Sequence, residues 1–166
     1  KMDGFSKFVT FEELTSTGRT NLLAINREAA LNDPVIINNL KILATKVLQP
    51  IRDFYSKPVK VTSGYRSKIL NIAVGGSQTS QHSHGEAADI QIEGISVDKL
   101  FEDLKSGKVV PLDNVGQVIK EKVGSAEWIH ISIMTPRYSE IQKAKYGSDE
   151  AVFLVTKDGK NYERTT

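Results

Sequence analysis

The sequence predicts a single α+β domain of 166 residues, in which N-terminal helices pack on a central antiparallel sheet. Three observations predict this class. A periodic apolar pattern typical of a buried helix falls early in the chain, alternating patterns typical of strands follow it, and the connections are short. We expect residues 1–58 to be mainly helical, residues 59–133 to form the sheet, and residues 134–166 to form a C-terminal hairpin region.

Two helices are expected in the N-terminal part. The first begins at Thr10, which forms a capping-box pattern with a glutamate three residues later. Residues 19–32 are interpreted as a mixed connection. The clearest helix begins at Asp33-Pro34, because Asp is a good N-cap and Pro suits the first helical position; Pro50 should kink it or split off its last turn. Its buried face is predicted from apolar residues at steps of three and four, namely Ile36, Leu40, Leu43, Val47, Ile51 and Phe54.

The later elements are predicted from alternation and from turn residues. Ser96 is a good N-cap for the second of two short helices. Strands are expected at residues 59–63, 87–92, 115–119 and 128–133, short helices at 67–74 and 97–105, a polar loop at 77–85, and a hairpin over 151–163 that turns at Asp158-Gly159.

The composition excludes several classes of function. A net charge of +2 is too small an excess to predict nucleic-acid binding. The absence of cysteine excludes disulfides, thiolate metal sites and cysteine nucleophiles. No apolar run is long enough to cross a membrane, and the first residues lack the apolar core of a signal peptide. We therefore expect no nucleic-acid or membrane partners, and a chain that is cytoplasmic, released by lysis as a phage enzyme would be, or trimmed from an exported form. We also expect a monomer.

The alternation of two predicted strands brings an acidic residue and a histidine together. If the isoleucines of residues 87–92 and 128–133 face the same core, Asp89 and His130 stand side by side on the opposite face. His82, in the loop before the first of these strands, can reach the same face. Two imidazoles and one carboxylate are a common ligand set for catalytic zinc, with a fourth position left for water. The alternative is a buried Asp–His pair without a metal.

Three sequence blocks together resemble one known family. Residues 80–89 (SQHSHGEAAD) fit S-x-H-x-x-G-x-A-x-D, residues 127–130 (EWIH) fit (D/E)-x-x-H, and residues 63–67 (SGYRS) match a third block upstream. In this order and spacing they resemble the zinc D-Ala-D-Ala carboxypeptidases of the Hedgehog/DD-peptidase fold. That group includes the vancomycin-resistance D,D-dipeptidases and phage peptidoglycan peptidases. The similarity runs from about residue 8 to about residue 133.

The resemblance implies a metal, a substrate and a place of action. It implies that His82, Asp89 and His130 bind one zinc ion. It further implies that a zinc-activated water hydrolyses peptide bonds of bacterial peptidoglycan stem peptides, in the cell wall or periplasm. The expected activity is that of a D-Ala-D-Ala carboxypeptidase.

The resemblance also assigns residues that act beside the metal. Glu127 would be the general base, and Arg66 would steady the oxyanion or the substrate carboxylate. Ser80 would hydrogen-bond the substrate, or serve only as a turn hydroxyl. Because Glu127 lies three residues before the last ligand, it must sit at a bend or bulge before the strand. Glu86 and Glu121 are rival bases.

Several alternatives remain open at the level of sequence. His84 faces the same way as His82 on an extended segment, but the family pattern selects His82 and places His84 beside the site or on the surface. An endopeptidase, or a non-catalytic cell-wall-binding or phage structural module, would carry the same blocks. Ser96 and Lys99 match the S-x-x-K string of serine D,D-peptidases, but the partner motifs S-D-N and K-T-G are absent.

Overall fold

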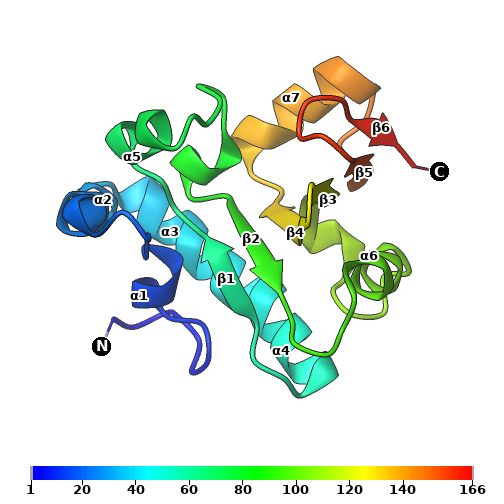
Figure 1. Cartoon of the computed structure of the whole chain (residues 1–166), viewed down its shortest axis with the longest axis horizontal. Helices are drawn as coiled ribbons and strands as arrows, with labels where there is room; N and C mark the ends of the chain where they lie inside the picture. Colours follow the sequence, from blue (N-terminus) through cyan, green and yellow to red (C-terminus); the bar gives the residue numbers. More distant parts are fainter. Residues whose placement is uncertain (1, 166) are drawn as a thin grey trace.

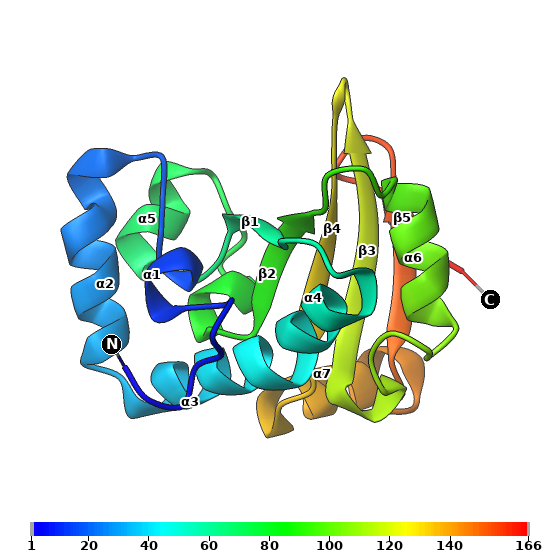
Figure 2. The same cartoon turned by 90° about the horizontal axis from the view of Figure 1, so that it is seen from below.

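The computed structural model describes residues 2–165, which form a six-stranded sheet with helices on both of its faces (Figures 1 and 2). The strand order is β1-β2-β4-β3-β5-β6. The predicted α+β class is confirmed. Neighbouring strands are antiparallel except for β3 and β5, which are parallel. The strands are β1 (Lys60–Ser63), β2 (Ala87–Gln91), β3 (Val115–Val123), β4 (Ala126–Ile133), β5 (Val152–Thr156) and β6 (Glu163–Arg164).

Short helices open the chain. The predicted capping box is confirmed, with the Thr10 hydroxyl accepting from the Glu13 amide at 3.2 Å and the Glu13 carboxylate accepting from the Thr10 amide at 3.3 Å. The prediction of a mixed connection over residues 19–32 is wrong, because most of it is helical. Its helix α2 begins without a side-chain cap and fully buries only Asn26 and Ala30, so the local signals are weak. The elements are α1 (Phe11–Leu14), η1 (Thr20–Leu22) and α2 (Leu23–Leu31).

The long predicted helix is continuous but changes its winding. It consists of α3 (Pro34–Ile42), a π-helical segment η2 (Leu43–Leu48) and α4 (Gln49–Tyr55). Pro50 has no amide hydrogen to donate to the carbonyl four residues earlier, and its ring crowds that carbonyl oxygen. The wider π turns just before Pro50 accommodate both effects, so the helix does not split. The prediction that Phe54 is buried is wrong: it is 45% exposed, and Tyr55, four residues after the buried Ile51, packs against the core.

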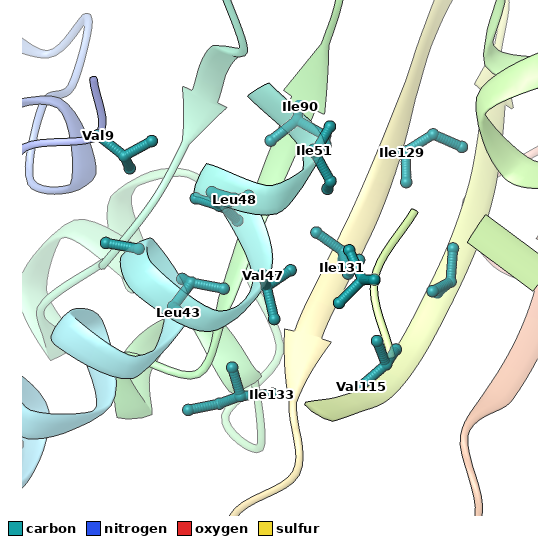
Figure 3. Packing of buried hydrophobic residues seen from close by; sticks show 14 of the residues in the cluster. Val9, Leu43, Val47, Leu48, Ile51, Ile90, Val115, Ile129, Ile131 and Ile133 are labelled. Carbon is teal, nitrogen blue, oxygen red and sulfur yellow. The ribbon is translucent and has the colours of Figure 1, made fainter. Parts of the chain in front are cut away.

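The core lies between this helix and one face of the sheet. Figure 3 shows Leu43, Val47 and Ile51 facing Ile129 and Ile131 of β4. Helix α6 (Val97–Lys105) contacts β3 and β4 and contributes to the same core. The predicted isoleucine face is therefore confirmed, and the polar residues of β2 and β4 are left on the opposite face.

The opposite face carries a helix that the sequence reading missed. Helix α7 (Pro136–Tyr146) follows β4 and precedes β5 along the chain. The prediction of only a hairpin region over residues 134–166 is therefore incomplete. The helix fully buries only Tyr138 and Gln142, which leaves almost no apolar period to detect. The predicted β5–β6 hairpin is present, with Leu154 opposite Arg164. The remaining elements are α5 (Lys68–Ala73), η3 (Gln81–His84) and η4 (Leu112–Asn114).

Among residues 2–165, no helix combines the length and the apolar character that a membrane crossing requires.

Candidate metal centre and active-site cleft

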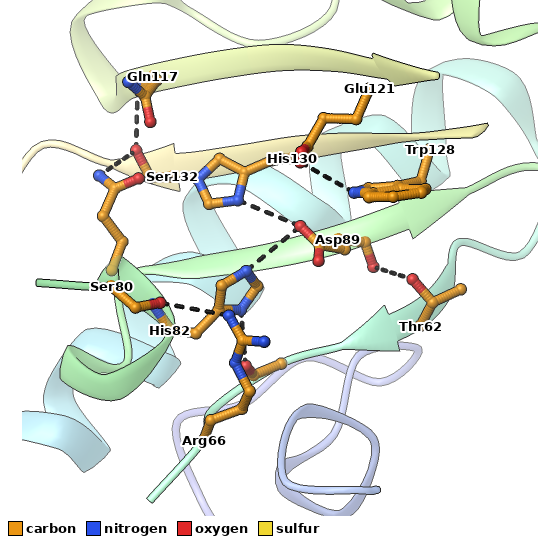
Figure 4. Close-up of polar contacts among 12 residues, drawn as sticks. Thr62, Arg66, Ser80, His82, Asp89, Gln117, Glu121, Trp128, His130 and Ser132 are labelled. Carbon is orange, nitrogen blue, oxygen red and sulfur yellow. Dashed lines mark hydrogen bonds and ion pairs between the residues drawn. The ribbon is translucent and has the colours of Figure 1, made fainter. Parts of the chain in front are cut away.

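The pairing of β2 with β4 places two of the predicted ligands directly opposite each other. In the antiparallel register Asp89 pairs with His130. Both side chains lie on the sheet face that the isoleucine core does not occupy, together with Trp128 and Ser132 of β4 (Figure 4). The predicted neighbourhood of Asp89 and His130 is therefore confirmed.

The third predicted ligand, His82, lies in the short 3-10 turn η3, within the segment predicted to be a polar loop. The Ser80 hydroxyl caps η3 by accepting from the His82 amide at 3.2 Å. Gly85 ends the turn with φ +68° and directs the chain into β2, a conformation that favours glycine. The Arg66 amide donates to the His82 carbonyl at 3.1 Å, so the segment after β1 fixes the position of His82.

His82, Asp89 and His130 converge on one point. Asp89 Oδ1 lies 3.3 Å from His82 Nε2 and 3.1 Å from His130 Nδ1, and the three candidate ligand atoms all lie within 4.8 Å of one another. Burial alone would raise the pKa of the Asp89 carboxyl, but charge attraction to His82 and hydrogen bonds from both imidazoles, which these rings supply in their protonated form, hold that pKa far below its usual value. Asp89 is therefore a carboxylate, as a metal ligand must be.

Each imidazole has one nitrogen beside Asp89, the near nitrogen, and one that points away from it, the far nitrogen. Both far nitrogens are hydrogen-bonded to carbonyl oxygens. His82 Nδ1 lies 2.8 Å from the Gly64 carbonyl, and His130 Nε2 lies 2.7 Å from Gln81 Oε1. A carbonyl oxygen can only accept, so each far nitrogen carries the hydrogen. In the neutral rings the lone pairs of His82 Nε2 and His130 Nδ1 then point toward Asp89. This is the arrangement that orients histidine ligands around a metal ion, and the donor set fits zinc.

Gln81 is the residue of this group that sequence reasoning overlooked, because it occupies a variable position of the matched block. Its amide nitrogen donates to Ser132 Oγ at 2.9 Å, and the Gln117 amide donates to the same oxygen at 2.9 Å. Gln81 is 7% exposed and Ser132 is fully buried. These contacts fix the Gln81 side chain, so its carbonyl can fix His130.

Replacing Gln81 is expected to weaken metal binding without removing a ligand. Gln81→Leu leaves the His130 Nε2 hydrogen without its acceptor, and we expect zinc affinity to fall by about 10- to 100-fold. A competition titration with a chromogenic chelator measures this. Gln117→Leu is the matched control, because only its backbone amide joins this network. Equal zinc affinity in Gln81→Leu and wild-type protein would contradict the role of Gln81.

The metal group lies in a cleft of about 740 Å³, which we call the central cleft. Arg66 lines it next to Ser80, whose hydroxyl accepts from Arg66 Nη2 at 3.3 Å. Arg66 Nε is buried without a hydrogen-bond partner within the described part of the chain. Burial lowers the pKa of Arg66, and the nearby carboxylates of Asp89 and Glu121 oppose that change. The guanidinium thus has donor capacity left for a ligand in the cleft.

Glu121 on β3 lines the central cleft, and Glu127 does not. Glu121 pairs with Trp128 across the β3–β4 hairpin, on the same face as His130. Its carboxylate accepts from Trp128 Nε1 at 2.9 Å. Burial raises the pKa of Glu121, and Asp89 raises it further, against the opposing effects of His130, Trp128 and Arg66. A carboxyl with a raised pKa beside a metal group has the property of a general base.

The bend that Glu127 needed is absent. Strand β4 begins at Ala126 and pairs regularly, with Glu127 opposite Lys122. Glu127 therefore points away from the metal group. Its side chain is 50% exposed, 3.9 Å from Lys122 Nζ, and it lines a separate hollow with Ile92 and Leu100. The irregularity in this hairpin lies instead in β3, between Val115 and Val118.

Two other candidates from the sequence serve different purposes. Glu86 is 1% exposed, and both of its oxygens accept hydrogen bonds from the Arg137 guanidinium, which anchors the start of α7. His84 does not line the central cleft; its carbonyl accepts from Asn39 Nδ2 at 2.9 Å. Asn26, in the segment interpreted as a connection, donates to the Tyr65 carbonyl at 3.0 Å and so holds the chain beside Arg66.

This combination of an α+β fold with a His–Asp–His group in an open cleft is typical of metal-dependent hydrolases. The sequence model of the Peptidase M15 family matches residues 9–132, and the chain belongs to this family. It is therefore a member of a family of metal-dependent peptidases that act on peptidoglycan. A comparison with curated proteins found no match.

Proposed function

We propose that this protein is a zinc-dependent D-Ala-D-Ala carboxypeptidase that acts on peptidoglycan stem peptides. One observation carries the proposal. The far nitrogens of His82 and His130 are both held by carbonyl oxygens, which leaves their near nitrogens and the Asp89 carboxylate aimed at one point. A buried Asp–His pair without a metal would not need two imidazoles oriented in this way.

The metal and the nearby carboxylate would divide the chemistry between them. A zinc ion held by His82, Asp89 and His130 would lower the pKa of water and polarise the scissile carbonyl. In this proposal Glu121 replaces Glu127 as the general base. Glu121 takes a proton from the attacking water and delivers it to the leaving amine. Its hydrogen bond from Trp128 Nε1 holds the carboxylate in place, and its raised pKa brings it closer to the working pH.

Arg66 would hold the terminal carboxylate of the substrate. Its guanidinium lies in the central cleft, and its Nε has no hydrogen-bond partner among residues 2–165. A planar guanidinium matches a carboxylate with two parallel hydrogen bonds. Ser80 supports this role by accepting from Arg66 Nη2. A fixed cation at one end of the cleft favours a carboxypeptidase over an enzyme that cuts within a chain.

A serine peptidase is disfavoured by the placement of the S-x-x-K string. Ser96 Oγ accepts from the Lys99 amide at 3.1 Å as the N-cap of α6. Lys99 Nζ lies 2.9 Å from Asp103, and neither Ser96 nor Lys99 lines the central cleft. A non-catalytic module is disfavoured because Arg66 and Glu121 both flank the metal group.

Mass spectrometry of digested peptidoglycan tests the proposal. Purified protein should remove one terminal alanine from stem pentapeptides when zinc is present, and a chelator should abolish this activity. Cleavage at a cross-link or within the stem would identify an endopeptidase instead. Protein that binds wall fragments and zinc but cleaves no bond would overturn the enzymatic proposal.

A further inference from the structure

The central cleft has a second wall that the proposed chemistry does not use. Helix α7 and the C-terminal hairpin supply this surface, which we call the α7 wall. It consists of Tyr138, Ile141, Gln142, Lys145, Tyr146 and Tyr162. All of these residues follow residue 132, where the family match ends. The wall is therefore a feature of this chain beyond the matched part of the family.

Gln142 lines the cleft as a buried residue of this wall and has an unused hydrogen-bond acceptor. The residue is fully buried, and its Nε2 donates to the carbonyls of Gly116 and Glu150 at 3.4 and 3.3 Å. These two acceptors fix which end of the amide is the nitrogen. Gln142 Oε1 is left without a hydrogen-bond partner within residues 2–165. A buried acceptor without a partner is unfavourable, so a ligand N–H in the cleft would satisfy it.

The α7 wall carries the positive charge of Lys145 and lies on the opposite side of the metal group from Arg66. Arg66 follows β1 at one end of the strand order, whereas the α7 wall lies over β3 and β5, where Tyr146 packs against Ile119 and Leu154. The metal group on β2 and β4 lies between these ends. Lys145 is exposed on the wall, with its Nζ 5.4 Å from the centre of the Tyr146 ring.

We infer that the α7 wall binds the part of the substrate on the amino-terminal side of the scissile bond. This inference rests on the proposed function, because Arg66 sets the direction of the peptide by holding its terminal carboxylate. A peptide that crosses the sheet from β1 toward β5 then places its preceding residues along α7. A backbone N–H of the peptide donates to Gln142 Oε1, and an acidic group of the peptide pairs with Lys145. The substrate class is an anionic peptide longer than a dipeptide.

The metal-group side of the cleft and the α7 wall would recognise different parts of the substrate. The metal group, Glu121 and Arg66 engage the scissile bond and the terminal residue, which every substrate of this activity shares. The α7 wall engages only the longer chain. The tyrosine rings of the wall add flat, largely apolar surface that suits an extended peptide.

Binding to zinc-loaded protein carrying Glu121→Gln tests the inference without turnover. The probes are the D-Ala-D-Ala dipeptide and a stem pentapeptide that ends in D-Ala-D-Ala and carries a free carboxylate on its D-glutamate. We expect the pentapeptide to bind more tightly than the dipeptide. We expect Lys145→Glu to raise the Kd of the pentapeptide by about tenfold and to leave the Kd of the dipeptide unchanged. Added salt should reduce the difference.

Lys143→Glu is the matched control, because it makes the same change in net charge on the same helix. Lys143 is 52% exposed, lies near Glu140 and Asp149, and does not line the central cleft. Gln142→Met gives a second measurement, again with loss of affinity for the pentapeptide alone. If Gln142→Met does not fold, the comparison of Lys145→Glu with Lys143→Glu decides.

Different failures have different meanings. Equal losses for both peptides, or equal effects of Lys145→Glu and Lys143→Glu, would overturn the α7 wall and leave the proposed function standing. A wild-type pentapeptide affinity no greater than that of the dipeptide would also overturn it. If zinc-loaded protein binds neither peptide, the proposed substrate is wrong, and the α7 wall proposal is overturned with it.

Discussion

Glu121→Gln is expected to lower kcat/KM for stem-peptide hydrolysis by about 10²- to 10⁴-fold, the range found for a lost general acid–base residue. The substitution keeps the side-chain shape and an oxygen that can accept from Trp128 Nε1, but it cannot take a proton from water. Zinc binding should persist, since the three ligands are unchanged. Steady-state kinetics and a zinc titration on the same preparation measure the two effects.

Glu127→Gln is the matched control and should retain nearly wild-type kinetics. Glu127 lies on the same hairpin but points to the other face of the sheet, beside Lys122. The opposite result, with Glu127→Gln inactive and Glu121→Gln active, would restore the assignment that the sequence pattern favoured. It would also require β4 to depart from its regular pairing when substrate binds.

The stability of metal-free Glu121→Gln provides a separate check that the variant folds. Burial, with help from Asp89, raises the pKa of Glu121 in the folded state. A carboxyl with a raised folded-state pKa favours folding at pH values below its unfolded pKa, and this contribution is lost as the pH rises through the folded value. Glutamine does not titrate. The variant should therefore melt at a higher temperature than wild type at neutral pH, and the difference should shrink below about pH 4.

Asp89→Asn is expected to abolish hydrolysis and to lower zinc affinity by more than about 100-fold, beyond the range typical of groups that only orient a ligand. The substitution removes the one negative charge among the three converging side chains. Isothermal titration measures the affinity. Zinc should raise the melting temperature of wild-type protein by mass action and have little effect on the variant.

Asp98→Asn is the control for Asp89→Asn, because it also removes one carboxylate. Asp98 is an exposed residue that pairs with Lys120 and Lys122 outside the central cleft. It should bind zinc as wild type does. Unchanged zinc affinity in Asp89→Asn would show that the metal, if one binds, is held elsewhere.

Much of the fold could be predicted because its signals are local. A capping box, an Asp-Pro helix start and strand alternation each depend on residues within a few positions of one another. The elements that escaped prediction lack an apolar period, although α7 begins with a capping Thr135 and Pro136 and ends at Gly147. Helix α2 has no side-chain cap, and α7 buries only Tyr138 and Gln142. Tertiary contacts stabilise these helices, among them the ion pair between Arg137 and the buried Glu86.

The candidate ligands could be predicted for the same reason, whereas the proposed general base could not. Alternation assigns Asp89 and His130 to the polar face of their strands from sequence alone. Whether Glu121 or Glu127 reaches that face depends on where β4 begins and on whether the β3–β4 hairpin is regular at these residues. In the structure β4 pairs regularly with residues 118–123 of β3, so Glu121 stands opposite Trp128 and beside the metal group; the shift in β3 lies farther along, between Val115 and Val118.

Local sequence patterns are enough to predict the α+β class, the isoleucine core and the two strand positions that bring Asp89 and His130 together. The folded chain was needed to show that Gln81 holds His130, that Glu121 lines the cleft, and that α7 forms its second wall. The two sets of features differ in the sequence range of the interactions that fix them. The face of the sheet to which a strand residue points alternates from one residue to the next, so it is fixed by the local sequence. The hydrogen bond from His130 to Gln81 joins residues 49 positions apart, and no local pattern specifies it.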